Sequence, residues 1–363
     1  MTDNFTQQVR TVLTDNILSF WLKYDKPEGA ILNSRIIWSF SAAYKALGRP
    51  EYLDAALRAY EWFKGHFLDP DYGGVFWSLD NFKKQLYAQG FAIYGLSELY
   101  KVTSDMEVLD LAVELYRVVE DNFADKVYGG YIEALSQDFS PLEDMSLSAH
   151  DINADKTMNS HLHILEAYAN LYQVWPDEGL KERVVELLDL AGGTIMAPDG
   201  HLQLYFKRDW TVLEGAVSFG HDIETSWLAL ECAFALKDES VIERVRPWAL
   251  KLGLAGNEGL LPDGSMRYEK HPDGSFDDER QWWVQAEAVV GNLWLWKYHG
   301  LSVGYDNSSA CWKYIRENLI DYEGGEWWWA ILPDGSIDRS HEKAGFWKCP
   351  YHNTRMCLQV ISL

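Results

Sequence analysis

The stretch "LDLAVELYRVVEDNFADKVYGGYIEALSQD" (residues 109–138) contains the pattern that decides the fold. Its first half, 109–123, places apolar residues three and four positions apart, which predicts an amphipathic helix. Its second half, 125–138, combines Asp and Gly with alternating aromatic and aliphatic residues, which favours a tight turn or a small hairpin. A helix followed by a short glycine-rich hairpin is therefore the expected unit of architecture.

This unit recurs along the chain. Similar segments rich in Gly, Asp and aromatics lie at 69–80, 197–210, 261–274 and 323–336, and helical stretches such as 35–48, 87–102 and 161–175 lie between them. Pairs of helices separated by hairpins and repeated about six times predict a closed ring of helix pairs. We expect an all-α fold, an (α/α)6 barrel with short β-hairpins in the loops at one end, formed by residues 1–363 as a single catalytic domain. An open solenoid of helix pairs is the alternative, and long Val/Ile-rich strands typical of an α/β fold are missing.

Composition limits the partners. The net charge of −23 repels a phosphate backbone, so we expect no nucleic acid. The N-terminal residues do not resemble a signal peptide, and no apolar stretch approaches the roughly 20 residues of a membrane span. Four cysteines without a CxxC pair suit a reducing compartment. These features predict a cytoplasmic protein that does not associate with membranes.

Polar residues at the starts of apolar helices are the candidates for a functional site. Inner helices of a closed ring are covered on most sides, so a polar cluster at one end of such a helix indicates a site there. The clusters are Arg35 in "NSRIIWSFSAAY"; Asn159, His163 and Glu166 in "KTMNSHLHILEAY"; His221, Glu224 and Trp227 in "GHDIETSW"; Trp283 and Glu287 in "RQWWVQAEAVV"; and Trp347 and His352 in "GFWKCPYHN". In the second and third clusters the members are spaced three or four apart, so they share a helix face, and Trp283 and Glu287 are four apart.

The ten histidines divide into three groups. Capping does not explain His221, because a cation at a helix start would meet the positive end of the dipole. His163 and His352 also lie near helix starts, beside Asn, Glu or Trp, and with His221 they are candidates for chemistry. For His161 two roles stay open, that of a buried core residue and that of a partner that supports the site residues. The remaining six are expected at the surface or in the core: His66, His150, His201, His271, His299 and His341.

Three kinds of site are compatible with some of these residues. A metal site has plausible ligand spacing in His161-x-His163 and in His221-x-x-Glu224. An arginine with several tryptophans is more typical of a sugar site, so we expect no metal and no cofactor. A glycosidase would use two carboxylates from Asp222, Glu224 and Glu287, but it does not need three central histidines. A non-catalytic sugar-binding protein would keep the tryptophans without needing the histidines.

Proton abstraction next to a carbonyl fits the histidines best. Removing the proton alpha to an aldehyde needs a base that titrates near neutrality, and returning a proton to the opposite face needs a second group. The enediolate formed in between needs hydrogen-bond donors, which an arginine or a third histidine supplies.

The motifs "SRIIWSFSAAY", "KTMNSHLH", "GHDIE", "QWWVQAEAVVGNLW" and "WKCPYHN" resemble those of cellobiose 2-epimerases in the N-acylglucosamine 2-epimerase superfamily, from about residue 30 to the C-terminus. The resemblance implies an (α/α)6 barrel without a cofactor. It also implies reversible C2 epimerisation of the reducing-end glucose of β-1,4-linked disaccharides, of cellobiose to glucosyl-mannose and of lactose to epilactose. The roles it implies are an acid/base pair, His221 and His352; an assisting histidine, His163; and substrate-binding residues Arg35, Tyr87, Asn159, Glu166, Glu224, Trp283, Glu287 and Trp347.

Related enzymes leave an alternative open. The resemblance extends to mannose 2-epimerases and to isomerases that interconvert mannose or glucose with fructose, which share the barrel and the histidines. An isomerase returns the proton to C1 instead of C2. Ala88 follows Tyr87 where the family pattern suggests a polar residue. The expected partner is a disaccharide or monosaccharide substrate, and the protein is expected to be a monomer or a homodimer.

Overall fold

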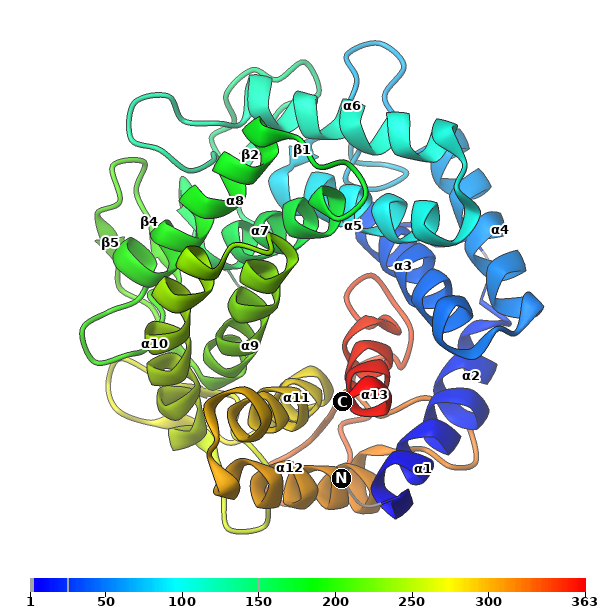
Figure 1. Cartoon of the computed structure of the whole chain (residues 1–363), viewed down its shortest axis with the longest axis vertical. Coiled ribbons are helices and arrows are strands. Elements are labelled where there is room, and N and C mark those ends of the chain that lie inside the picture. The colour runs from blue at the N-terminus through cyan, green and yellow to red at the C-terminus, as the bar shows by residue number, and fades with distance from the viewer. Residues whose placement is uncertain (1–2, 25, 149–150) are drawn as a thin grey trace.

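A computed structural model describes residues 3–24, 26–148 and 151–363. In these residues six helices form an inner ring, in which each contacts the next and the last contacts the first (Figure 1). They are α3 (Ala30–Leu47), α5 (Leu86–Thr103), α7 (Met158–Tyr172), α9 (Phe219–Ala235), α11 (Trp282–His299) and α13 (Tyr351–Ser362). The closing contact between α13 and α3 makes the open-solenoid alternative wrong.

An outer helix packs against each inner helix. The outer helices are α1 (Asp3–Thr11), α4 (Pro50–His66), α6 (Met106–Asn122), α8 (Glu178–Leu190), α10 (Glu239–Gly256) and α12 (Ser302–Tyr314). Short helical segments extend or follow some of them: η1 (Val12–Leu18), α2 (Ser19–Trp21), η2 (Ala191–Ile195), η3 (Asn257–Gly259) and η4 (Ile315–Leu319). Because α1 pairs with α13, the two ends of the chain complete the sixth pair. This packing favours one domain, which stays a prediction.

Burial follows the sequence pattern of each ring. In the inner helix α11, residues 282–295 are all buried, and Glu287 is the one charged side chain among them. The outer helix α6 buries Val108, Leu109, Ala112, Val113, Leu115, Tyr116 and Val119, which recur three and four positions apart and leave the opposite face to solvent. The inner ring is thus covered on both sides, and the core lies mainly between the two rings.

Glycines allow neighbouring inner helices to approach closely. A Cβ atom on Gly95 of α5 would lie 2.6 Å from the carbonyl oxygen of Ser34 in α3. A Cβ atom on Gly291 of α11 would lie 2.5 Å from Cγ1 of Ile223 in α9. No larger residue fits at either position without a shift of the helices.

The short strands lie at the N-terminal ends of the inner helices. All pairings are antiparallel: β1 (Lys84–Gln85) with β2 (Ala134–Leu135); β3 (Lys156–Thr157) with β4 (Tyr205–Phe206) and β5 (Val212–Leu213); β6 (Val217–Ser218) with β7 (Glu269–Lys270) and β8 (Phe276–Asp277); and β9 (Arg280–Gln281) with β10 (Ala330–Ile331). The strands β1, β3, β6 and β9 each run directly into an inner helix. The predicted barrel with hairpins at one end is confirmed.

A repeated hydrogen bond fixes these hairpins to the inner ring. The fourth residue of four inner helices accepts a hydrogen bond from a backbone N–H in the loop after the outer helix that precedes it in the chain: Gln89 from Val75, His161 from Tyr131, Asp222 from Leu202, and Gln285 from Met266. His161 accepts this bond at Nε2, 3.0 Å from the Tyr131 nitrogen, and its Nδ1 bonds the Thr157 carbonyl. Both ring nitrogens of His161 therefore serve the scaffold.

Among the described residues, no helix is both long enough and apolar enough to cross a membrane.

Candidate active site

The first turns of the inner helices bring the predicted site residues together near the barrel axis. Tyr87, Asn159, Trp283 and His352 are the second residues of α5, α7, α11 and α13, while Arg35, His163, Glu224 and Glu287 are the sixth residues of α3, α7, α9 and α11. Residues four apart lie on one face of a helix, so these positions repeat one inward-facing direction around the ring. His221, the third residue of α9, packs against Trp283, with ring centroids 4.8 Å apart and the two rings tilted by 49°.

Each of the three candidate catalytic histidines is held through Nδ1. His163 donates to Glu166 at 3.0 Å, and His352 donates to Glu287 at 2.8 Å. His221 pairs with the Ser218 hydroxyl at 2.8 Å. Because a carboxylate only accepts hydrogen bonds, His163 and His352 carry a proton on Nδ1, and Nε2 is the nitrogen available to a substrate.

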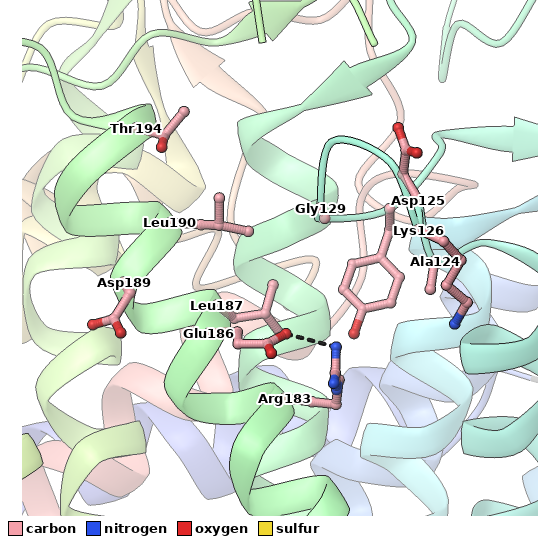
Figure 2. A pocket seen from close by; sticks show the side chains of 12 residues that line it. Ala124, Asp125, Lys126, Gly129, Arg183, Glu186, Leu187, Asp189, Leu190 and Thr194 are labelled. Atoms are coloured by element: carbon pink, nitrogen blue, oxygen red, sulfur yellow. Dashed lines mark hydrogen bonds and ion pairs between the residues drawn. The ribbon is translucent and has the colours of Figure 1, made fainter. Parts of the chain in front are cut away.

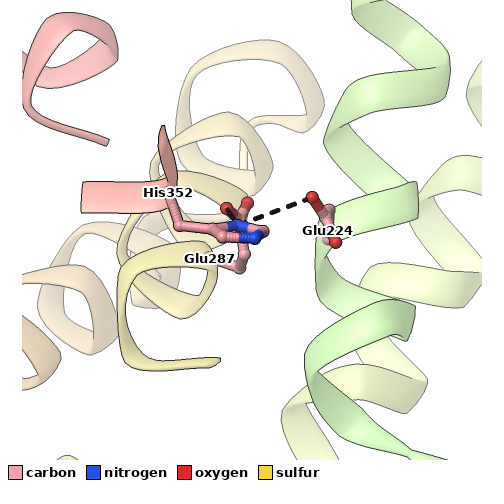
Figure 3. A group of neighbouring side chains, drawn as sticks. All are labelled: Glu224, Glu287 and His352. Carbon is pink, nitrogen blue, oxygen red and sulfur yellow. Dashed lines mark hydrogen bonds and ion pairs between the residues drawn. The ribbon is translucent and has the colours of Figure 1, made fainter. Parts of the chain in front are cut away.

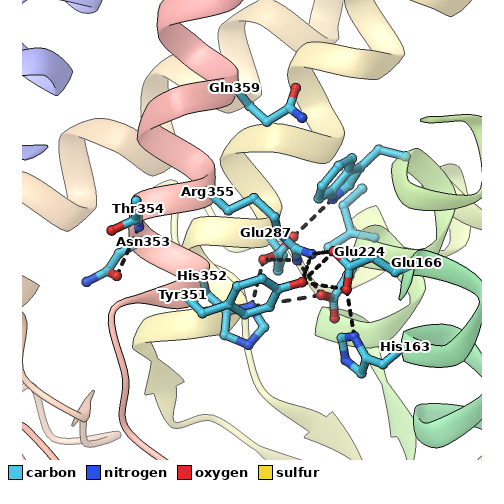
Figure 4. Close-up of polar contacts among 12 residues, drawn as sticks. His163, Glu166, Glu224, Glu287, Tyr351, His352, Asn353, Thr354, Arg355 and Gln359 are labelled. Carbon is cyan, nitrogen blue, oxygen red and sulfur yellow. Dashed lines mark hydrogen bonds and ion pairs between the residues drawn. The ribbon is translucent and has the colours of Figure 1, made fainter. Parts of the chain in front are cut away.

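Arg355 connects the carboxylates behind these histidines (Figure 4). One of its terminal nitrogens donates to Glu166, 2.5 Å away, and the other donates to both Glu224 and Glu287. Tyr351 also donates to Glu166. All these side chains are buried, with Arg355 2% exposed. One guanidinium thus fixes three carboxylates, two of which hold or approach His352.

Burial and charge separate the pKa values of the carboxylates. Burial acts to raise the pKa of Glu166, but the Arg355 charge and hydrogen bonds from His163 and Tyr351 outweigh it and hold that pKa at about 2. Burial and the neighbouring Glu287 charge raise the pKa of Glu224 to about 7. Glu224 therefore exchanges a proton near neutral pH, while Glu166 stays ionised.

The acid/base histidines are held neutral. Burial lowers the pKa of His221 to about 3, and the nearby His163 adds to the shift. Burial, together with the positive charges of Arg35 and Arg355, lowers the pKa of His352 well below its ordinary value. Neither histidine therefore has the near-neutral pKa that the sequence reasoning expected of the base, because burial penalises the charged form. Both are neutral at pH 7, which is the form that can accept a proton.

Arg35 lies among uncharged groups. It donates to the Tyr87 hydroxyl at 2.8 Å and to Cys349 Sγ at 3.5 Å. Its guanidinium lies 4.1 Å from the ring centroid of Phe91 and 4.9 Å from that of Tyr351. Among the described residues no carboxylate forms an ion pair with it, and its Nε is buried without a hydrogen-bond partner. Unlike the Arg355 charge, the Arg35 charge is thus available to an anion.

Aromatic rings and one amide flank this centre. The ring centroids of Trp283 and His352 are 5.6 Å apart, and those of Trp347 and Tyr87 are 6.3 Å apart. Asn159 has a buried Oδ1 without a hydrogen-bond partner in the described part of the chain. An unpaired buried oxygen is costly unless a ligand or water satisfies it, which fits a binding role for Asn159.

The metal alternative does not fit the contacts. The side chains of Glu224, Glu287 and His352 point toward one another (Figure 3), and their ligand atoms lie within 4.8 Å of one another. Arg355 already donates to both carboxylates, so a guanidinium supplies the positive charge that a cation would bring. The pair His161-x-His163 is also excluded, because both nitrogens of His161 are bonded to backbone.

Two other sequence candidates make their hydrogen bonds outside this centre. Asp222 accepts hydrogen bonds from His201 Nδ1 and from the Leu202 backbone N–H. Its carboxylate is thus bonded to the hairpin, which does not suit a role as one of two glycosidase carboxylates. His341 pairs with Asp338 near the surface. His150, expected at the surface or in the core, lies outside the described residues.

Arg355 and Tyr351 were missed by the sequence reasoning. Arg355 follows His352 by three positions, so the rule of shared helix faces that grouped the other candidates could have found it. Tyr351 begins α13 and lies four positions before Arg355, so the same rule links it to Arg355 but not to His352, its direct neighbour. Trp227, grouped with His221 and Glu224 from the sequence, donates to Glu287 at 3.0 Å.

A separate pocket of about 590 Å³ lies outside this centre (Figure 2). Residues 124–126 and 129–131, the outer helix α8 and Thr194 of η2 line it. Arg183 in this pocket is paired with Glu186 at 2.6 Å, and none of the predicted site residues lines it. We assign it no part in the chemistry.

Comparison with known proteins gives the same family as the motifs. The model of the N-acylglucosamine 2-epimerase (GlcNAc 2-epimerase) family matches residues 22–355, and the chain belongs to this family. The predicted family membership is thus confirmed.

Individual relatives are similar over their whole length. A cellobiose 2-epimerase of Bacteroides fragilis is 43% identical over 99% of this chain and 100% of its own, and one of Ruminococcus albus is 36% identical over 98% of each. The solved structure of cellobiose 2-epimerase from Spirochaeta thermophila superposes with a TM-score of 0.93 at 35% identity, covering 99% of this chain and 96% of its own. A D-mannose isomerase of Marinomonas mediterranea is more distant, 21% identical over 91% of this chain and 86% of its own.

Proposed function

We propose that this protein reversibly epimerises C2 of the reducing-end glucose of β-1,4-linked disaccharides, converting cellobiose to glucosyl-mannose and lactose to epilactose. The observation that carries the proposal is the group of three imidazoles, each fixed through Nδ1 and two of them with lowered pKa. The similarity to several cellobiose 2-epimerases over the whole chain supports it.

The reaction begins with opening of the pyranose ring. His352, assisted by its bond to Glu287, is suited to move the proton of the anomeric hydroxyl to the ring oxygen as the bond between C1 and that oxygen breaks. In the aldehyde form the C2 hydrogen is acidic, and either neutral His221 or neutral His352 removes it. The electron pair moves onto the aldehyde oxygen, and an enediolate forms.

The second half of the reaction restores the hydrogen on the other face. Rotation about C2–C3 presents the opposite face of the enediolate, and the partner imidazole delivers a proton to C2. The partner imidazole must take up a proton at Nε2 before it delivers one, because Nδ1 of His352 already carries the proton donated to Glu287. Glu224, with a pKa of about 7, is the carboxyl of this centre suited to release that proton and to take back the one that the first imidazole removed from C2.

Positive charge stabilises the intermediate. Arg35 is the one guanidinium of the described centre without a carboxylate partner, so we assign it to the enediolate oxygens. A preorganised donor in a buried site typically contributes about 3 kcal/mol to such a transition state. His163 and Asn159 are assigned to the sugar oxygens, and Trp283 and Trp347 to stacking on the sugar rings.

Four buried cysteines without disulfides, all within the described residues, support a cytoplasmic location as part of this proposal. For the oligomeric state we keep a monomer or a homodimer as the proposal.

Product analysis tests the function. The protein is incubated with cellobiose, lactose, glucose and mannose in D2O, and products are followed by NMR. The proposal predicts a mannose-configured reducing end that carries deuterium at C2. A ketose product would instead establish the isomerase alternative, and release of the reducing-end sugar would mean hydrolysis.

The roles of the two histidines are tested by His221→Ala and His352→Ala. Each should lower turnover of cellobiose at least ~100-fold, the usual effect of losing a general acid or base. Unchanged turnover in both variants would reject the assigned pair.

A further inference from the structure

Glu326 is a buried carboxylate that the chemistry above does not use. It is 0% exposed and lies in the turn of residues 321–326 that follows the outer helix α12 and the segment η4. Lys348 donates to it at 2.8 Å, Asn353 at 2.6 Å, and the Trp21 indole N–H donates to it as well. One side chain thus gathers donors from the N-terminal segment, from the loop before α13 and from α13 itself.

The backbone at Glu326 indicates that this side chain is needed. Its φ angle is 63°, in the left-handed region that favours glycine. The matching turns after α4 and α6 have glycine at this position, Gly74 with φ 75° and Gly130 with φ 68°. The three turns share the same closing bond, in which the aspartate that begins the turn donates its N–H to the carbonyl of this sixth residue. A glutamate here costs backbone strain that glycine avoids.

The repeat around the ring shows what Glu326 replaces. In four other units, the fourth residue of an inner helix bonds the loop backbone, as Gln89 and Gln285 do. In α13 the fourth residue is Thr354, whose Oγ1 has no partner in the described part of the chain. Glu326 instead accepts the Trp327 backbone N–H at 2.8 Å and adds side-chain bonds to α13. In the unit that contains His352, a loop residue, Glu326, therefore makes the bonds that an inner-helix residue makes in the other four units.

The bonded residues lie on both sides of His352 in the chain. Lys348 precedes it by four positions and follows Trp347 directly, and Asn353 is the next residue after His352. Lys348 is 1% exposed, and its ammonium lies 4.9 Å from the ring centroid of Trp282. Fixing both neighbours of a short segment restricts the backbone that carries the His352 imidazole.

We propose that Glu326 is a positioning residue, which sets the His352 imidazole and the Trp347 ring by holding Lys348 and Asn353. This proposal rests on the proposed epimerase function. The hydrogen bonds and ion pair of Glu326 go to Trp21, Trp327, Lys348 and Asn353 and not to His352, so it acts on the reaction through the geometry of residues 347–353.

Two variants and one control test the proposal. Glu326→Gln keeps the shape but removes the charge. The double variant Glu326→Gly with Lys348→Met relieves the left-handed strain and also removes the buried ammonium that would otherwise lose its partner. Asn292→Ala is the matched control, because Asn292 is equally buried in α11 and bonds Asn257 and Asn307 away from the histidines.

The readouts are kcat and KM for cellobiose, and the ratio of C2 deuterium exchange to inversion in D2O, measured from each epimer. Misplacing one imidazole should lower kcat about 10- to 100-fold. The unaffected imidazole still removes and returns hydrogen on its own face. The exchange-to-inversion ratio should therefore rise at least about fivefold for one of the two epimers.

The outcomes separate the two proposals. A purely structural role would lower exchange and inversion by the same factor, as expected for Asn292→Ala, and the ratio would stay at the wild-type value. An active wild-type protein with an unchanged ratio in both Glu326 variants would overturn the positioning role alone. A wild-type protein that forms no mannose-configured product would overturn the epimerase function, and the role of Glu326 with it.

Discussion

The substitution His161→Gln tests whether His161 belongs to the scaffold or to the chemistry. Gln occupies the same fourth helix position in α5 and α11, where Gln89 and Gln285 each bond both the N–H and the carbonyl of a loop residue. A glutamine at 161 can accept the Tyr131 N–H in the same way. We expect the variant to fold and to keep kcat for cellobiose within about twofold of wild type, since surrounding acid/base groups are unchanged.

The same substitution should change the pH dependence of stability. Burial lowers the pKa of His161 from 6.5 to about 4, although its bond to Thr157 opposes the shift. The folded state thus binds fewer protons than the unfolded state between these values. The stabilisation is complete above pH 6.5 and is lost as the pH falls toward 4. Between about pH 7.5 and about pH 5.5, wild type should lose about 1.4 kcal/mol relative to the glutamine variant.

Urea unfolding of both proteins at the two pH values measures this difference. The other titrating groups are common to both proteins. The change in unfolding free energy between the two pH values, compared between the two proteins, therefore reports on residue 161. A range that stays above the sequence pI of about 4.8 avoids precipitation. Equal pH dependence in the two proteins would refute the buried neutral imidazole, and a loss of kcat on the scale of a missing base would refute the scaffold role.

Three further changes have definite expected outcomes. Gly95→Ala should lower the free energy of unfolding by about 1–3 kcal/mol, measured in urea, because the new methyl group would lie 2.6 Å from the Ser34 carbonyl oxygen; no loss would mean that α3 and α5 pack less closely. Arg355→Met should destabilise the protein by about 3–5 kcal/mol, since buried carboxylates lose their shared cation, and an unchanged melting temperature would contradict that network. Asn159→Ala should raise KM for cellobiose more than it lowers kcat, and steady-state kinetics showing the reverse would remove it from substrate binding.

Much of the fold followed from the sequence, because helix periodicity and glycine-rich turns are local signals. The repeat of helix, helix and hairpin predicted a closed barrel, and the contact between α13 and α3 confirms the closure. The pairing of α1 with α13 brings the first and last helices together, and no local sequence pattern in residues 3–11 predicts this contact.

The site was predictable where helical spacing carried it. His163 and Glu166 share a face of α7 and are bonded, as their spacing of three suggested. The bonds from Arg355 to Glu166 and Glu224 join segments 189 and 131 residues apart, and they depend on ring closure. Similarly, the bond between His161 and Tyr131 was not visible, because it depends on how a hairpin docks onto a helix.

The central claim is that His221 and His352 serve opposite faces of C2. The most direct test is C2 hydrogen exchange in D2O with His221→Ala and His352→Ala, each supplied separately with cellobiose and with its mannose-configured epimer. One variant should exchange only the glucose-configured sugar and the other only the mannose-configured sugar, because each retains one base. Exchange of the same epimer by both variants would contradict the account.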